Sequence, residues 1–262
     1  MFNPHKLLAI FAMGLLGFGS LPAKADLSDV LKSGTINIAI PESFSPFGSL
    51  GSEGKYVGFD VDVAKLIAKD LGVKLKLVPV TSKQRIPFLE TGKVDLVISS
   101  MGANPGRAKS IWFSNAYAPF FSGAFAPKSM AISNPSDLAG KKVGLTGGTL
   151  EDLEITATAP KDTQIIRFGD NAATIAAYLS KQVDVLVTGN TVAAKLSKDN
   201  SNLDIQTKFI IKDSPCFIGV RKGEFDMLQW INVFILHKIL GGNLNKLSEK
   251  WFGQKLPKLP TL

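Results

Sequence analysis

Cysteine and histidine are scarce in this chain of 262 residues. Cys216 is the sole cysteine, which excludes an intrachain disulfide, and a lone cysteine is most often buried and unreactive. The two histidines, His5 and His237, provide neither a histidine-based triad nor a histidine metal site. Two common means of activating a nucleophile or holding a metal are therefore missing.

Several short motifs are missing as well. The sequence has no Gly-x-Ser-x-Gly, no P-loop and no dinucleotide fingerprint after a strand. Its lysines are spread along the chain, without the basic runs typical of a nucleic-acid groove. We therefore expect no cofactor and no nucleic-acid partner.

The only long apolar run lies at the N-terminus. Lys6 is followed by an uncharged apolar stretch over 7–18 and by small residues at Ala23 and Ala25, a pattern that predicts a signal peptide cut before Asp26. The run is shorter than the roughly 20 residues of a membrane-spanning helix. No cysteine stands at the cut, so we expect export to the periplasm without a lipid anchor. Cleavage would lower the net charge from +8 to +6, because it removes two lysines and no acid.

Strand and helix patterns alternate along the rest of the chain. Strands are predicted at 36–40, 75–80, 95–99, 142–145, 164–168 and 183–187, with helices at 63–71, 86–89, 149 onward, 172–179, 224–240 and up to 251. Thr149 and Asp152 resemble a capping box. The face of the 172–179 helix is predicted to consist of Ala172, Ile175, Ala176 and Leu179. This order predicts two α/β units, each a parallel sheet with helices on both faces.

Two extended, non-helical segments separate these units. They cover 117–125 and 209–218, and we interpret them as a two-strand hinge. The resulting prediction is a first lobe of residues 26–120 and 216–262 and a second lobe of residues 121–215. A small ligand would bind in the cleft between the lobes, near the carboxyl ends of parallel strands.

The segment Ser99–Arg107 combines two serines, two glycines and an arginine directly after a buried-strand pattern at 94–98. Hydroxyls and backbone N–H groups can bind one oxygen of a carboxylate while a guanidinium binds the anion in bidentate fashion. The alternative is a polar turn whose arginine pairs with a surface acid. The surrounding sequence favours the carboxylate clamp.

Five blocks of sequence resemble family 3 of the bacterial periplasmic solute-binding proteins, which bind polar amino acids. The blocks are Gly58–Ala64, Arg85–Pro87, Gly92–Leu96, Pro105–Lys109, and Phe113–Ser114 with Tyr117. The resemblance implies the type II periplasmic-binding-protein fold: two lobes, each a βαβ sheet with flanking helices, joined by a two-strand hinge. It also implies a monomer without enzymatic activity that delivers its ligand to an ABC permease of the inner membrane.

The resemblance also assigns ligand-binding residues. The carboxylate clamp of the family corresponds to Ser100, Gly102 and Arg107, and Thr149 would close over the same anion from the start of a helix in the second lobe. That position suits an anion because of the helix dipole. Phe44 matches the aromatic residue on which ligands of the family stack, although it could also be a core residue.

Within the family, the segments Thr81–Pro87 and Glu42–Ser43 are most similar to the glutamate/aspartate-binding branch. In that branch, the residues at the positions of Ser82 and Arg85 contact the ligand. Two arginines in one cleft would suit a dicarboxylate. Alternatively, Arg85 only braces the lobe, as its counterpart does in other branches.

The sequence also departs from the family pattern. Gly102 replaces a threonine, Pro41 replaces an arginine of the acidic branch, and Gly189 replaces the aspartate that pairs with the ammonium of the ligand. Glu42 and Asn190 are the remaining candidates to accept that ammonium, since an unpaired buried charge is costly.

Three alternatives stay open at this point. The ligand could be a carboxylate without an amine, or the chain could be an enzyme similar to cyclohexadienyl dehydratases. In the latter case Glu42 or Glu151 would serve as the general acid. A ligand-sensing module would share the same cleft.

Overall fold

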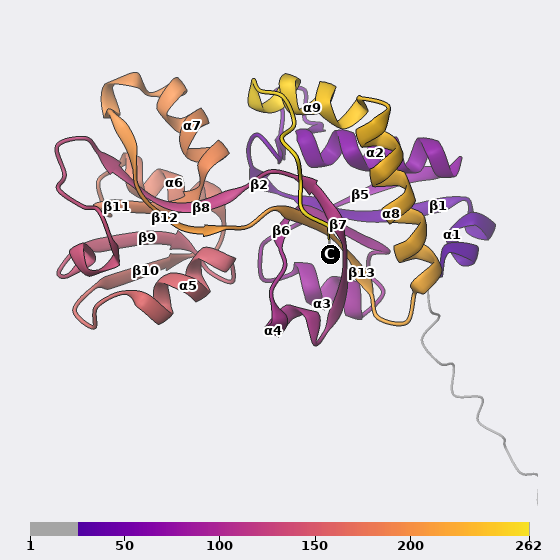
Figure 1. The fold of residues 1–262 in the computed structure, drawn as a ribbon, viewed down its shortest axis with the longest axis horizontal. Helices are drawn as coiled ribbons and strands as arrows, with labels where there is room; N and C mark the ends of the chain where they lie inside the picture. The colour runs from indigo at the N-terminus through magenta and orange to yellow at the C-terminus, as the bar shows by residue number, and fades with distance from the viewer. Residues whose placement is uncertain (1–25, 262) are drawn as a thin grey trace, which may run out of the picture.

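The computed structural model describes residues 26–261 as two α/β lobes lying side by side, each built on a five-stranded sheet (Figure 1). The predicted signal peptide, residues 1–25, lies outside the described residues. The first sheet has the strand order β5 (Lys74–Val80), β1 (Thr35–Pro41), β6 (Leu96–Gly102), β13 (Cys216–Arg221) and β7 (Ile111–Ala118). The second has the order β10 (Gln164–Phe168), β9 (Lys142–Thr146), β11 (Val185–Gly189), β8 (Phe121–Pro127) and β12 (Ile205–Asp213).

Both sheets are mixed, so the prediction of parallel sheets is wrong in part. β5, β1 and β6 run parallel, whereas β13 and β7 are antiparallel to their neighbours. β10, β9 and β11 are parallel in the second sheet, and β8 and β12 are antiparallel. The cause is the hinge: the chain leaves the first sheet along β7 and β8 and returns along β12 and β13, and these strands extend both sheets.

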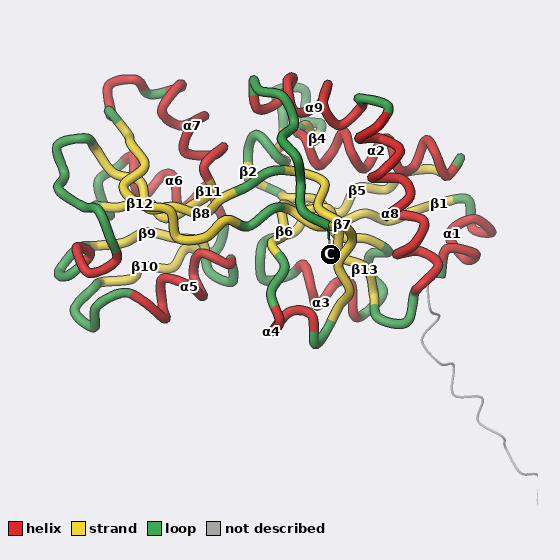
Figure 2. Tube along the Cα trace, in the orientation of Figure 1, coloured by secondary structure: helices red, strands yellow, loops and turns green. Residues whose placement is uncertain are grey.

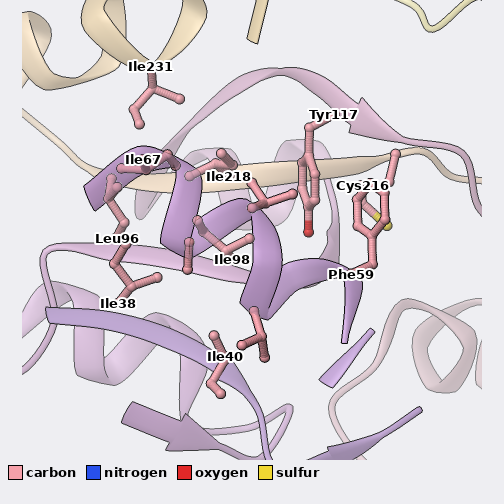
Figure 3. Packing of buried hydrophobic residues seen from close by; sticks show 14 of the residues in the cluster. Ile38, Ile40, Phe59, Ile67, Leu96, Ile98, Tyr117, Cys216, Ile218 and Ile231 are labelled. Carbon is pink, nitrogen blue, oxygen red and sulfur yellow. The ribbon is translucent and has the colours of Figure 1, made fainter. Parts of the chain in front are cut away.

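Helices cover both faces of the first sheet (Figures 1 and 2). One face carries α1 (Leu27–Ser33), α2 (Phe59–Leu71), α8 (Phe225–Leu240) and α9 (Asn243–Phe252), and the other carries α3 (Arg85–Glu90) and α4 (Pro105–Ala108). Because strand side chains alternate, Ile38 and Ile40 of β1 pack into the larger core, whereas Ala39 packs into the smaller one. Figure 3 shows the larger core, in which Phe59, Tyr117 and Cys216 lie together. Cys216 is buried, as predicted.

The first lobe also contains a small three-stranded sheet. It comprises β2 (Ser43–Phe44), β3 (Gly48–Leu50) and β4 (Tyr56–Val57). β2 directly follows β1, so Ser43 and Phe44 lie at the carboxyl end of a central strand of the large sheet. This position brings them to the edge at which a ligand is expected.

The helices of the second lobe are α5 (Leu150–Thr158) on one face and α6 (Asn171–Leu179) and α7 (Asn190–Asp199) on the other (Figure 1). Two 3-10 turns, Pro135–Leu138 and Ser201–Leu203, complete it. The predicted buried face of α6 is wrong in part: the helix buries Thr174, Ala177 and Tyr178, whereas Ile175 is only partly buried and Leu179 is exposed. Alanine burial contributes little free energy, and the Thr174 hydroxyl bonds both to the Asp170 carbonyl and to Thr146.

The chain crosses between the lobes between β7 and β8 and again between β12 and β13. A backbone hydrogen bond of 3.0 Å from the N–H of Ser214 to the carbonyl of Phe120 joins the two crossings. None of the helices within residues 26–261 combines the length and the apolarity needed to cross a bilayer.

Candidate functional site

A cleft between the lobes brings together eight of the nine residues predicted to bind the ligand. They are Glu42, Phe44, Ser82, Arg85, Ser100, Gly102, Arg107 and Thr149. The first lobe provides the first seven, at the carboxyl ends of β1, β5 and β6, and the second lobe provides Thr149 at the start of α5. The ninth residue, Asn190, does not line this cleft.

Asn190 lies outside the cleft because its side chain completes the backbone pairing of β8. Its Oδ1 accepts a hydrogen bond of 3.1 Å from the N–H of Phe121. The residue begins α7, directly after β11, and lines a second pocket that includes Phe121, Thr191 and, from the first lobe, Phe252. Its proposed role as acceptor of a ligand ammonium is therefore not supported by its position.

Arg107 holds a position between the two lobes. Nη1 donates to the carbonyl of Gly102 at 2.7 Å, and Nη2 donates to the carbonyl of Gly148, in the other lobe, at 3.1 Å. Asn104 caps the short helix α4 by accepting a hydrogen bond of 2.7 Å from the N–H of Arg107. This bond fixes the backbone of the arginine. Burial partly desolvates the guanidinium of Arg107, and this desolvation lowers its pKa. An anion that neutralises it is correspondingly favourable.

Ser100 lies within β6, not in a loop after the strand as predicted, and its backbone is strained. Its φ is +43°, in the left-handed region that a serine rarely adopts. The buried carboxylate of Asp60 accepts a hydrogen bond of 2.8 Å from the N–H of Ser100. This bond holds the strained backbone and leaves the serine side chain on the cleft.

Asp60 is itself held from the core side. It is fully buried, and its second oxygen accepts a hydrogen bond of 2.7 Å from the hydroxyl of Tyr117. Burial raises the pKa of Asp60 to about 7, although the bonds from Tyr117 and Ser100 and the charge of Arg85 oppose that rise. The sequence Gly58–Ala64 carried the resemblance to the family, but the pattern alone gave Asp60 no role.

Arg85 braces the first lobe and also lines the cleft. Nε donates to the carbonyl of Ser82 at 3.1 Å, and Nη1 donates to that of Ser99 at 2.9 Å. Its pKa is lowered to about 9, mainly by burial and secondarily by the nearby charge of Arg107. Arg85 thus fixes the backbone around Ser82 and Ser99 and also lines the cleft, while its contact with a ligand stays a prediction.

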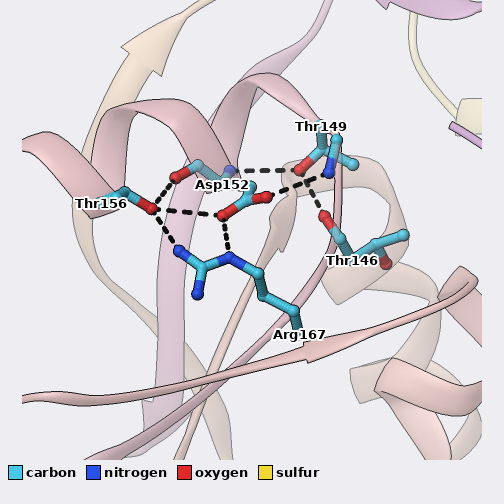
Figure 4. Close-up of polar contacts among 6 residues, drawn as sticks. Thr146, Thr149, Asp152, Thr156 and Arg167 are labelled. Atoms are coloured by element: carbon cyan, nitrogen blue, oxygen red, sulfur yellow. Dashed lines mark hydrogen bonds and ion pairs between the residues drawn. The ribbon is translucent and has the colours of Figure 1, made fainter. Parts of the chain in front are cut away.

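The second lobe places the N-terminus of α5 at the cleft, and Figure 4 shows the polar contacts around Thr149. The hydroxyl of Thr149 donates to the carbonyl of Thr146 at 2.9 Å and accepts from the N–H of Asp152 at 3.2 Å. The hydroxyl proton of Thr149 is thus engaged with Thr146, and its oxygen caps the helix. Since the N–H of Asp152 is engaged with Thr149, the groups free to bind an anion here are the backbone N–H groups of Leu150 and Glu151, which have no acceptor within the helix.

A polar network fixes this helix end (Figure 4). The carboxylate of Asp152 accepts from the N–H of Gly148 at 3.0 Å and from Nε of Arg167 at 2.8 Å. The expected capping box is therefore shifted by one residue, since Asp152 binds the N–H of Gly148 and not that of Thr149. The network aligns the first turn of α5 with the cleft.

The cleft is lined by three acidic and two basic side chains: Glu42, Glu151, Asp170, Arg85 and Arg107. Glu42 of the first lobe and Asp170 of the second approach each other closely enough that the charge of Asp170, after burial, raises the pKa of Glu42. Glu151 is only 6% exposed and accepts no hydrogen bond from any residue in the part of the chain that the structure describes. Glu42 and Asp170 are available to a cationic group, whereas the charge of Glu151 already acts on Arg85 and Arg107 and opposes the lowering of their pKa by burial.

Sequence reasoning missed Asp170 as a residue of the cleft and considered Glu151 only as a catalytic acid. Asp170 follows β10 and caps α6, with its Oδ1 accepting from the N–H of Ala173 at 2.8 Å. An N-capping acid at the carboxyl end of a predicted strand was a visible signal. For Glu151, the second residue of α5, the position next to Thr149 was the available signal.

Phe44 belongs both to the cleft and to an aromatic cluster. It is 6% exposed and stacks on Phe47 with ring centroids 5.7 Å apart, while the ring of Phe120 lies at 6.3 Å. Phe44 therefore lines the cleft and also packs in the core of the first lobe. Within residues 26–261, no group of three metal-binding side chains occurs.

Residues 36–254 match the bacterial extracellular solute-binding proteins, family 3. This chain belongs to that family. It is 28% identical to the L-cystine-binding protein TcyJ of Escherichia coli over 259 residues, which cover 97% of each protein. It is 29% identical to the glutamine-binding protein GlnH of Bacillus subtilis over 257 residues, 96% of this chain and 93% of that one.

A solved structure supports the same conclusion. An ancestral arginine-binding protein bound to arginine is 35% identical, with a TM-score of 0.78 over 84% of this chain and 99% of that one. The predicted family and the two-lobed fold are therefore confirmed. The named relatives are binding proteins, so the chain is a solute-binding protein and not an enzyme. Their names give no support to the glutamate/aspartate branch, which stays a prediction.

Proposed function

We propose that this protein is a periplasmic, monomeric amino-acid-binding protein that delivers its ligand to an ABC permease. The observation that carries this proposal is the pairing of Arg107 and Ser100 in one lobe with the free N–H groups at the start of α5 in the other. A carboxylate bound there contacts both lobes. Such a ligand binds the closed arrangement better than an open one and shifts the population toward it.

The moving bodies are the lobes divided at the hinge. We place the first at residues 26–120 and 216–262 and the second at residues 121–215. Each has its own five-stranded sheet, the chain passes between them at the two crossings, and Val192 of α7 packs from the second lobe against the core of the first. No chemical change in the ligand is needed for this function.

The acids of the cleft indicate that the ligand carries an amine. Glu42 and Asp170 face each other from opposite lobes, and an ammonium between them would relieve their repulsion. This arrangement replaces the aspartate absent at Gly189, and it argues against an amine-free carboxylate. With three acids against two arginines, the cleft favours a neutral or basic amino acid over glutamate or aspartate.

A ligand screen by thermal shift tests the proposal, since a ligand that binds only the folded protein raises the melting temperature. We expect L-arginine, L-glutamine or L-cystine to raise it, and L-glutamate and succinate to leave it unchanged. Stabilisation by succinate alone would refute the amine subsite. Product formed from prephenate or arogenate would refute the binding function in favour of the dehydratase alternative.

A further inference from the structure

Two residues of the hinge project into the cleft. Phe120 and Ser214 stand at the two crossings between the lobes, joined by the backbone hydrogen bond described above, and both line the cleft. Neither lies in a segment that sequence patterns associate with ligand binding. Each fills the space beside a glycine of one lobe.

Ser214 occupies the side-chain space of position 102. A Cβ atom added to Gly102 would lie 2.2 Å from Oγ of Ser214 and 3.6 Å from its Cβ. The first distance is far below any real contact, whereas the second is an ordinary one. The serine hydroxyl therefore lies where a side chain on residue 102 would begin, next to the carbonyl that Arg107 binds.

The hydroxyl of Ser214 is available to a ligand. Ser214 is 6% exposed, and its hydroxyl has no hydrogen-bond partner among residues 26–261. Its oxygen is not sealed in the core, because the residue lines the cleft. A nearly buried hydroxyl without a partner is unfavourable by itself, so a polar group of a ligand is its natural complement.

Phe120 fills the space beside Gly189, as Ser214 fills the space beside Gly102. A Cβ on Gly189 would lie 2.1 Å from two atoms of the Phe120 ring. The ring is held in place by an edge contact with Phe47 at 5.8 Å. The ring could not keep this position if residue 189 had a side chain. Phe120 therefore gives the cleft an aromatic wall here.

We propose that the hinge supplies part of the ligand-binding surface: the Ser214 hydroxyl donates to the ligand carboxylate beside Arg107, and Phe120 forms an apolar wall. The two residues take the places that side chains at 102 and 189 would otherwise fill. This inference rests on the proposed function and deepens it. It makes the hinge a determinant of specificity as well as of motion.

The first test is the affinity of the full protein for L-arginine and L-glutamine, measured by isothermal titration calorimetry. Ser214→Ala is expected to weaken binding about 3- to 10-fold, the usual effect of one lost hydrogen bond. Ser122→Ala is the matched control, because Ser122 is a buried serine of β8 that does not line the cleft. If the two variants bind alike while Arg107→Ala loses binding, the hinge assignment is wrong and the proposed function stands.

The second test moves the hydroxyl from the hinge to the strand. Gly102→Thr alone should lower both the melting temperature and the affinity, since its Cβ collides with the Ser214 hydroxyl. Adding Ser214→Ala should recover part of both, because it removes the clash with the hydroxyl and leaves the side chain of Leu150, whose Cδ2 would lie 3.1 Å from the new Cβ, as the tightest remaining contact. A Gly102→Thr protein with the melting temperature of the parent would overturn the packing argument, even if neither amino acid binds.

Discussion

The two lobes contribute to the cleft in different ways. The half from the first lobe is fixed by buried contacts: Asp60 holds the strained Ser100, and Arg85 bonds the carbonyls around it. The half from the second lobe consists of helix ends, with backbone N–H groups at α5 and the capping Asp170 at α6. The first lobe is thus preorganised for an anion, and the second adds contacts that depend on closure.

The charge distribution follows the same division. Both arginines of the cleft belong to the first lobe, whereas Glu151 and Asp170 belong to the second. We therefore expect a zwitterionic ligand to bind the arginines of the first lobe first and then to attract the acids of the second lobe through its ammonium. Each of the following variants tests one side of this comparison.

Arg107→Ala should have the largest effect, because Arg107 is the clamp of the first lobe and also reaches Gly148 of the second. We expect binding to weaken by about 2–4 kcal/mol, or roughly 30- to 1,000-fold, since a carboxylate would be left unpaired. Isothermal titration calorimetry against the ligand found in the screen measures this loss. Arg107→Lys keeps the charge but not the two-pronged geometry, so it should recover only part of the affinity. Binding within a few-fold of the parent in Arg107→Ala would exclude the clamp.

Asp170→Asn should have the next largest effect on binding. Asparagine caps a helix about as well as aspartate, so the start of α6 is preserved while the charge is lost. Affinity for an amine-bearing ligand should fall about tenfold.

Asp184→Asn is a suitable control for this substitution. Asp184 is another acid of the second lobe, bonded to the N–H of Lys142 and absent from the cleft. Equal affinities for the two variants would show that Asp170 does not take part in binding the amine.

Asp60→Asn should change how stability depends on pH. The pKa of Asp60 is raised in the folded protein to about 7, so the folded state holds a proton that the unfolded state releases near pH 4. Its contribution to stability is therefore present below about pH 4 and is lost as the pH rises to about 7. Urea denaturation across this range should show a smaller loss for Asp60→Asn than for the parent protein.

Glu224 provides a comparison for the pH experiment, because it is a second acid with a raised pKa and does not line the cleft. Burial, opposed by Arg221, also raises its pKa to about 7, and it lies away from the cleft. Glu224→Gln should therefore flatten the pH dependence without altering affinity. If the curve of Asp60→Asn runs parallel to that of the parent, the raised pKa of Asp60 is refuted.

Asn190→Ala should have the smallest effect on binding. Its side chain satisfies the N–H of Phe121 and does not reach the cleft, so we expect unchanged affinity and a stability loss of about 1 kcal/mol. Thermal unfolding and calorimetry on the same sample separate the two effects. A clear loss of affinity with unchanged stability would restore Asn190 as a ligand contact.

The sequence alone determined the family, the main strands and helices of both large sheets, and most of the first lobe's half of the cleft, but not α1, α4, α7 or the small sheet of β2, β3 and β4. Local patterns sufficed there, because Ser100, Gly102 and Arg107 are close in sequence. The first two lie on β6 and the third on the short helix α4 that follows it. Alternating apolar residues likewise predicted β1.

Only the tertiary structure decided which distant residues complete the cleft. The antiparallel strands β7, β8, β12 and β13, the buried face of α6 and the position of Asn190 depend on how the chain passes the hinge twice, which no local period encodes. The same is true of the space beside Gly102 and Gly189, which Ser214 and Phe120 fill. A glycine in the sequence shows only that a side chain is missing, whereas packing decides which residue takes its place.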